Sequence, residues 1–297
     1  MDTFILLTVT GLALGALYFL IASGLSLIYG LMGVLNFAHG AFLTVGSYAA
    51  WWSSVKLQGT IGSIGLRFAV SVVIGLAVGA GVAALVELVL IRPLYLRHIE
   101  QVLVTVGLSF ALVALVQAYW GPDLHTIDVP SWLNGTTGLG GAHVPNYNFV
   151  EILVAAGVLA GLLAFLRFTR YGLIIRAGVE NRAMVTALGI DVKKAFTLVF
   201  AIGGVAAALA GVLAGIHFSE IDPTQGTSLL IFAFIVVVIG GLGSIVGSAV
   251  AAVVVGLVQQ YVNYKSTGIG DLSVVLLLAI TLLIRPGGLF GKWSPTH

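Results

Sequence analysis

The chain has 297 residues, of which 59% are apolar and 8% are charged, and its mean hydropathy is +1.12. A soluble domain carries about 25% charged residues, so we exclude a water-soluble fold and expect a protein covered by lipid. The formal net charge of +2 is too small to favour nucleic-acid binding. The absence of cysteine excludes disulfides, thiolate metal sites and thiol catalysis.

Long apolar runs predict an all-α transmembrane bundle that forms a single domain over residues 1–297. Backbone amides in hydrocarbon must be satisfied within their own segment, which requires helices, and a crossing needs roughly 20 residues. The first run is too long for a signal-peptide core and is expected to be retained. We expect about eight or nine spans, at 4–29, 41–57, 66–91, 101–120, 148–168, 196–217, 228–240, 248–262 and 272–285.

Three of these spans are short, at 41–57, 228–240 and 248–262, and each borders a glycine-rich break. Some of them are therefore expected to be half-helices or re-entrant segments, which leaves eight crossings as the alternative to nine. Small residues four apart, such as Gly75 with Gly79, predict close packing between helices rather than chemistry. The other such pairs are Gly204 with Ala208 and Gly211 with Gly215.

The basic residues predict the orientation, because cytoplasmic loops carry an excess of Lys and Arg. With the N-terminus outside and the C-terminus cytoplasmic, 10 of the 13 basic residues fall inside. Segment 121–147 then forms an external loop. Segment 169–195 lies in the cytoplasm and resembles an amphipathic helix on the membrane surface. The inner residues are Arg92, Arg97, Arg167, Arg170, Arg176, Arg182, Lys193, Lys194, Arg285 and Lys292, and the outer ones are Lys56, Arg67 and Lys265.

A first candidate site lies between the first two spans, in residues 30–40. Asn36, His39 and the following Gly40 are candidates for lining a translocation path, because polar residues at membrane depth usually face a bundle interior or a watery path. The interrupted backbone is also typical of broken helices at transport sites. The alternative is an ordinary cytoplasmic turn with an N-cap asparagine. A histidine without neighbouring Cys, Asp or Glu is a poor metal ligand, so no metal site is expected.

A second candidate is the glycine-rich segment 239–248. Its glycines resemble a phosphate-binding loop, but no lysine follows and no strand precedes it. We therefore expect no nucleotide or other cofactor here, and a tight connection between two half-length helices instead. Exposed amides on this turn remain candidates for contact with a zwitterionic substrate. The residues concerned are Gly240, Gly241, Gly243 and Ser244.

The third candidate is the inner segment 170–191. Ala183, Ala187 and Ile190 form a narrow apolar stripe at helical spacing, which suits a short helix that docks into a groove on a cytoplasmic partner. A surface helix held by lipid headgroups is the alternative. The candidate coupling residues in this segment are Arg176, Glu180, Asn181, Arg182, Ala183 and Gly189.

Acidic residues within the spans are nearly absent. Glu87 is the one acid that we expect well inside a span, near the inner surface and paired with basic neighbours. A proton-relay carboxylate is the alternative interpretation. Ion-coupled carriers usually need ionisable groups at mid-depth, so energy for uphill transport would have to come from outside the chain.

Five short motifs are spread along the chain: Leu35-Asn-Phe-Ala-His-Gly-Ala-Phe42, Arg92-Pro-Leu94, Thr105-Val-Gly-Leu-Ser109, Gly240-Gly-Leu-Gly-Ser244 and Arg285-Pro-Gly-Gly-Leu-Phe-Gly291. Together they resemble LivH-type permeases of branched-chain amino acid ABC importers. The resemblance covers about residues 10 to 291, and the inner segment Glu180–Gly189 is similar to the loop through which ABC permeases engage their ATPases. Glu180 is followed by Asn181 and Arg182, where many importers have Glu-Ala-Ala.

This resemblance implies a permease of the bacterial inner membrane that imports leucine, isoleucine and valine by alternating access. Its expected partners are a second, LivM-like permease, two cytoplasmic ATP-binding subunits, an extracytoplasmic substrate-binding protein and membrane lipid. ATP hydrolysis would occur in the partner subunits, so the chain itself is not expected to be an enzyme. The alternatives are the same machinery importing urea, short amides or other amino acids, an ATP-independent channel or facilitator, and a membrane anchor that transports nothing.

Overall fold

The protein is mostly helical. The computed structural model describes residues 2–33, 35–95, 97–187, 189 and 192–291, and the side chains at 31, 179–183 and 186 fall outside this description. The helices are α1 Asp2–Met32, α2 His39–Leu57, α3 Ile64–Val86, α4 His98–Trp120, α5 Ser131–Asn134, α6 Asn146–Phe168, α7 Arg170–Ala187, α8 Val192–His217, α9 Gln225–Gly240, α10 Ile245–Lys265 and α11 Gly270–Ile284.

Six helices in the described part of the chain are long and apolar enough to cross a membrane. They are α1, α3 with its extension to Leu94, α4, α6, α8 and α10, whereas α9 and α11 are shorter apolar helices. Each of the nine predicted spans coincides with helical residues. The expectation of a short helix at 248–262 is wrong, because α10 has 21 residues.

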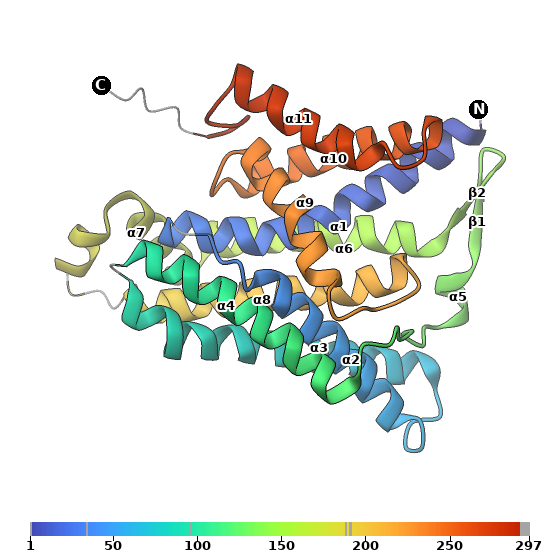
Figure 1. Ribbon diagram of the computed structural model, residues 1–297, viewed down its shortest axis with the longest axis horizontal. Helices are drawn as coiled ribbons and strands as arrows, with labels where there is room; N and C mark the ends of the chain where they lie inside the picture. Colours follow the sequence, from blue (N-terminus) through green and yellow to red (C-terminus); the bar gives the residue numbers. More distant parts are fainter. Residues whose placement is uncertain (1, 34, 96, 188, 190–191, 292–297) are drawn as a thin grey trace.

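The connecting segments gather at two opposite ends of the bundle. Figure 1 places the N-terminus, α5 and the β-hairpin at one end, called the hairpin end below, and α7 at the other, the α7 end. The loops predicted on the same side of the membrane therefore lie at the same end of the molecule. The predicted alternation of the loops between the two sides therefore agrees with their positions in the structure, whichever end faces the cytoplasm.

Small residues allow helices at the centre to pack with their backbones in contact. A Cβ added at Gly79 of α3 would lie 2.6 Å from the Cβ of Ala208 in α8, and one added at Gly15 of α1 would lie 2.6 Å from the carbonyl oxygen of Ala252 in α10. Gly204 of α8 in turn packs against the backbone of Gly79. The prediction that the small residues of α3 and α8 serve helix packing is confirmed.

The segment 121–147, which the sequence predicts to be external, contains a short β-hairpin that the all-α prediction missed. Strand β1 (Thr136–Leu139) pairs antiparallel with β2 (Ala142–Pro145). The connecting Gly140 and Gly141 have φ values of 56° and 92°, the left-handed backbone that two-residue hairpin turns require and that glycine supplies without strain. The Gly-Gly pair between two short runs was the available signal.

Candidate functional site

The chain between α1 and α2 turns back into the bundle before α2 begins. The Nε2 atom of His39 lies 3.1 Å from the carbonyl oxygen of Ile21. Ile21 precedes the end of α1 at Met32 by about 16 Å of helix, at 1.5 Å per residue. The start of α2 therefore lies deep within the bundle, as Figure 1 also shows. The structure supports the interpretation of this segment as an interrupted backbone. It does not support the alternative of an ordinary turn at the membrane surface.

Asn36 organises this break through its side chain and its backbone. Its Oδ1 accepts a hydrogen bond from the amide of Ala38 at 3.1 Å, and its carbonyl accepts one from the amide of His39 at 3.2 Å. The neighbouring amide of Phe37 donates to the hydroxyl of Thr105 in α4 at 3.3 Å. Asn36 is 3% exposed, and its Nδ2 has no partner among the described residues. A buried amide donor without a partner is costly, which keeps Asn36 as a candidate for contact with a ligand.

The break borders an apolar cavity of about 190 Å³. Asn36 and Thr227 border it, but the surface that the cavity exposes is apolar. Small-molecule sites are lined predominantly by apolar side chains. The lining residues are Leu25, Leu35, Asn36, Phe37, Thr227, Leu230, Ile231 and Phe234.

His39 and Gly40 have packing roles at this site. His39 is fully buried and holds the start of α2 against α1 through Ile21. The Gly40 backbone contacts Gly226 so closely that a Cβ on either residue would clash with the other. These two glycines bring the first turns of α2 and α9 together beside the cavity. His39 and Gly40 shape the cavity without lining it.

The segment 240–244 is a tight turn at the α7 end. None of its residues lines the cavity beside Asn36. Ser244 caps α10 by accepting a hydrogen bond from the amide of Gly247 at 3.1 Å. A Cβ at Gly241 would collide with Gly291, and one at Gly243 would lie 3.0 Å from the Cα of Gly30. Gly240 is packed against Gly247. The predicted tight connection is confirmed, while its role in a translocation path remains a prediction.

A second cavity, of about 190 Å³, brings this turn together with α7. Arg176 and Ile175 of α7 line it beside Gly243 and Gly30. Ile175 is buried, whereas Arg176 is exposed and Gly189, just beyond α7, has a φ of 77°. The side chains of Glu180, Asn181, Arg182 and Ala183 lie outside the described residues, as does Ile190 of the predicted apolar stripe. The predicted helix at this place is confirmed, and its docking role remains a prediction.

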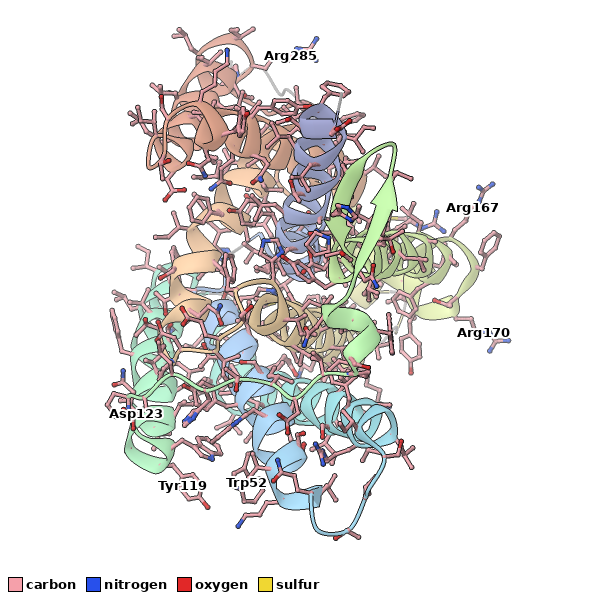
Figure 2. The ribbon with its side chains drawn as sticks, turned by 90° about the vertical axis from the view of Figure 1, so that its right-hand side faces the viewer. Trp52, Tyr119, Asp123, Arg167, Arg170 and Arg285 are labelled. Atoms are coloured by element: carbon pink, nitrogen blue, oxygen red, sulfur yellow. The ribbon has the colours of Figure 1, made fainter. Side chains whose placement is uncertain are left out.

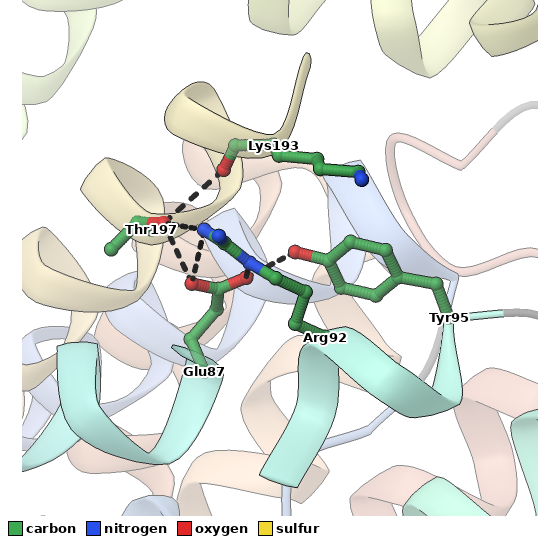
Figure 3. Close-up of polar contacts among 5 residues, drawn as sticks. All are labelled: Glu87, Arg92, Tyr95, Lys193 and Thr197. Carbon is green, nitrogen blue, oxygen red and sulfur yellow. Dashed lines mark hydrogen bonds and ion pairs between the residues drawn. The ribbon is translucent and has the colours of Figure 1, made fainter. Parts of the chain in front are cut away.

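Glu87 forms a buried polar cluster at the end of α3 (Figure 3). Its carboxylate is fully buried and accepts from Arg92 Nε at 3.4 Å and from the hydroxyls of Thr197 at 2.6 Å and Tyr95. Arg92 Nη2 also donates to the Thr197 hydroxyl at 2.8 Å. The predicted pairing of Glu87 with a basic neighbour is confirmed. Tyr95 and Thr197 were missed, because Thr197 meets Glu87 only through the packing of α8 on the π-helical turn Glu87–Ile91.

Glu87 was expected to be the one acid well inside a span, and this expectation is wrong. Glu151 of α6 is also fully buried, and its Oε2 lies 3.1 Å from Nδ1 of His217 at the end of α8. The position of Glu151 inside the apolar run 148–168 was the signal, but its partner is 66 residues away. The two acids that are buried in the described part of the chain therefore each have a basic or imidazole partner.

These features define a multi-pass helical membrane protein with a backbone break beside an apolar cavity. A family model described as branched-chain amino acid transport system / permease component matches residues 7–285. The chain therefore belongs to the family of branched-chain amino acid transport permease components.

Individual relatives match over nearly the whole chain. The high-affinity branched-chain amino acid transport system permease protein LivH of Escherichia coli is 30% identical over 291 residues, covering 95% of this chain and 94% of its own. The corresponding protein BraD of Pseudomonas aeruginosa is 31% identical over 295 residues, covering 96% and 94%. LivH of Salmonella typhimurium is 29% identical over 289 residues, covering 95% and 94%. No solved structure matches the chain.

Proposed function

We propose that this chain is the permease subunit of an ATP-driven importer that carries branched-chain amino acids across the bacterial inner membrane by alternating access. The observation that carries the proposal is the break at Asn36 beside an apolar cavity, in a chain of the permease family. The aliphatic wall suits a branched apolar side chain, and the unpartnered Nδ2 of Asn36 suits the substrate carboxylate. Asn36 is thus assigned to the translocation path, with His39 and Gly40 as residues that position it.

The proposed topology has nine crossings, with the N-terminus and the hairpin end outside and the C-terminus and the α7 end in the cytoplasm. Basic residues in the loops support this orientation, because Lys and Arg concentrate on the cytoplasmic side. Arg97, Arg167, Arg170 and Arg176 flank the helix ends near α7, where lipid headgroups would surround them. The short helices α2 and α9 begin at His39 and Gln225, where Gly40 and Gly226 are in contact inside the bundle, and both are included among the nine.

The proposed assembly contains a second, LivM-like permease, two ATP-binding subunits and a substrate-binding protein. The ATP-binding subunits would bind α7 and the following turn at the α7 end. The binding protein would dock on the hairpin end, at 121–147 and 218–227. An external energy source is required because the buried acids Glu87 and Glu151 are both paired and supply no free proton relay. The coupling residues would be Arg176, Glu180, Asn181, Arg182, Ala183 and Gly189.

The experiment that tests this proposal reconstitutes the complete assembly in liposomes and follows leucine uptake and ATP hydrolysis together. We expect concentrative uptake only with ATP, and none from the purified chain alone. ATP-independent passage through the chain alone would instead show a channel or facilitator. Urea or a short amide taken up in preference to leucine would reassign the substrate.

The coupling part of the proposal has its own variants. Arg182→Ala and Ala183→Asp should each reduce uptake while ATP hydrolysis by the assembly continues and the protein still inserts. Arg167→Ala, a change in an exposed arginine of α6, serves as the control that leaves coupling intact. Wild-type uptake in both test variants would contradict the assignment of α7 as the coupling helix.

A further inference from the structure

A third cavity, with polar walls and a volume of about 410 Å³, opens at the hairpin end, which faces the viewer in Figure 2. The start of α3, the segment 126–134 and the end of α8 line it. Its volume falls within the roughly 300–1,000 Å³ typical of small-molecule sites. The lining residues are Ile64, Arg67, Thr126, Ile127, Asp128, Val129, Asn134, Gly215, Ile216 and Ser219.

Arg67 provides an unused donor in this cavity. The residue is 9% exposed, and its Nη2 donates to Asp128 Oδ2 at 3.1 Å. Its Nε is buried and has no partner in the described structure. The guanidinium presents its donors as a rigid fork that matches a carboxylate, and a buried charged donor without a partner is costly. Arg67 therefore offers a place for the carboxylate of a ligand.

Asp128 provides the opposite charge beside it. The described hydrogen bonds of its carboxylate, from Arg67 and from Gln58 Nε2 at 3.0 Å, both fall on Oδ2. The side chain is 45% exposed, so Oδ1 remains open to a donor from solvent or from a ligand. Arg67 and Asp128 are hydrogen-bonded to each other. Their two charges are complementary to a carboxylate and an ammonium group on one small molecule.

The remaining wall divides into an aliphatic and a polar part. Ile64, Ile127, Val129 and Ile216 supply apolar surface, while Thr126, Asn134 and Ser219 supply hydroxyl and amide groups. Ser219 has a φ of 61° and is the one residue other than glycine with a positive φ in the described chain. Such a backbone costs free energy and is found most often at functional sites.

We propose that this cavity is an entry site for a free zwitterionic α-amino acid with an aliphatic side chain, separate from the Asn36 cavity. Arg67 binds the carboxylate, Asp128 accepts from the ammonium group, and the aliphatic wall covers the side chain. The substrate class rests on the proposed function. An acidic side chain of a docked protein could supply the same carboxylate, but it would leave the Asp128 acceptor and the aliphatic wall unused.

The test measures binding of radiolabelled leucine to the full chain in lipid nanodiscs, without the binding protein or the ATP-binding subunits. Arg67→Gln and Asp128→Asn should each weaken leucine binding at least about tenfold, since hydrogen bonds to charged groups contribute on that scale. Thr126→Trp should block the cavity without touching the ion pair. Lys265→Gln, at an exposed basic residue of the same end, should bind as wild type.

Two comparisons distinguish a ligand site from an ion pair that only holds the segment 126–134 against α3. Arg67→Lys keeps a positive charge beside Asp128 but removes the planar fork that matches a carboxylate, so wild-type leucine binding by this variant would overturn the proposal, and weakened binding supports it. Isoamylamine and 4-methylpentanoate, which each lack one charged group of leucine, should compete weakly. Full competition by 4-methylpentanoate would show a carboxylate site only and would overturn the zwitterion assignment.

The complete importer distinguishes this inference from the proposed function. If wild-type assembly imports leucine but Arg67→Gln and Thr126→Trp bind and import it normally, the entry site is wrong and the function stands. If wild-type assembly imports no leucine while the isolated chain still binds it, the proposed function fails independently of the site.

Discussion

The Nε2 atom of His39, at the start of α2, lies 3.1 Å from the carbonyl oxygen of Ile21 in the interior of α1. Gly24, one turn further along α1, makes room for the ring, because a Cβ there would lie 2.7 Å from His39 Cε1. A single side chain thus fixes the depth at which α2 begins. The position of Asn36 and the cavity beside it depend on this contact.

Replacing His39 with alanine should therefore destabilise the bundle. The change removes a fully buried side chain and leaves a cavity, which for a large-to-small core substitution costs about 2–5 kcal/mol. We expect a lower melting temperature in detergent and reduced leucine uptake. His39→Gln, which retains a polar group, should be less affected. Equal melting temperatures for His39→Ala and wild type would show that the contact does not anchor α2.

The contact between Gly40 and Gly226 predicts a sharp difference between two glycine-to-alanine changes. Gly226→Ala places a methyl group against the Gly40 backbone and the Thr44 hydroxyl, so α2 and α9 must separate and folded protein should be lost. Gly81→Ala in α3 meets no atom within 4 Å and should be neutral or slightly stabilising, by up to about 1 kcal/mol of helix propensity. Yield of monodisperse protein after size-exclusion chromatography measures both.

The Glu87 cluster predicts an asymmetry between its two charged members. Arg92→Gln leaves a fully buried carboxylate without its charged partner, which for a buried pair costs about 3–5 kcal/mol. Glu87→Gln removes the buried charge and leaves Arg92, 33% exposed, in reach of solvent, so its cost should be smaller. Thermal unfolding of both single variants and the double variant gives the comparison. Equal losses for the two single variants would contradict it.

The orientation can be measured on a background free of native thiols, because the chain has no cysteine. A cysteine at Gly138 in the hairpin should react with a membrane-impermeant maleimide in cells whose outer membrane has been permeabilised and whose inner membrane is intact. A cysteine at Arg170 should react only after the inner membrane is permeabilised. The reverse labelling pattern would invert the proposed topology.

The hydropathy pattern predicted the helices well, since each span must satisfy its own amides and leaves a continuous apolar run. The motif at Asn36 located the break, but its depth depends on the bond between His39 and Ile21, which are 18 residues apart. Contacts between distant segments, such as Glu151 with His217 and Arg67 with Asp128, arise only when helices pack. No local pattern specifies them.

The hairpin and the length of α10 show two different failures of local patterns. Gly140 and Gly141 signalled a hairpin turn, but the surrounding strands are four residues each and too short for a clear alternation. In α10, the predicted span 248–262 omitted the first three residues, which follow the glycine-rich turn, and the more polar last residues Asn263, Tyr264 and Lys265. Hydropathy marks the apolar part of a helix and not the residues at which its hydrogen bonding begins and ends.

The central claim is that substrate passes the break beside Asn36, and filling the adjoining cavity tests it most directly. Thr227→Trp should occupy the cavity of about 190 Å³ in the reconstituted assembly, and Val250→Trp, on an exposed face of α10, is the control. We predict that Thr227→Trp abolishes ATP-dependent leucine uptake while folding and ATP hydrolysis persist, and that the control imports normally. Normal leucine uptake by a folded Thr227→Trp assembly would contradict the account.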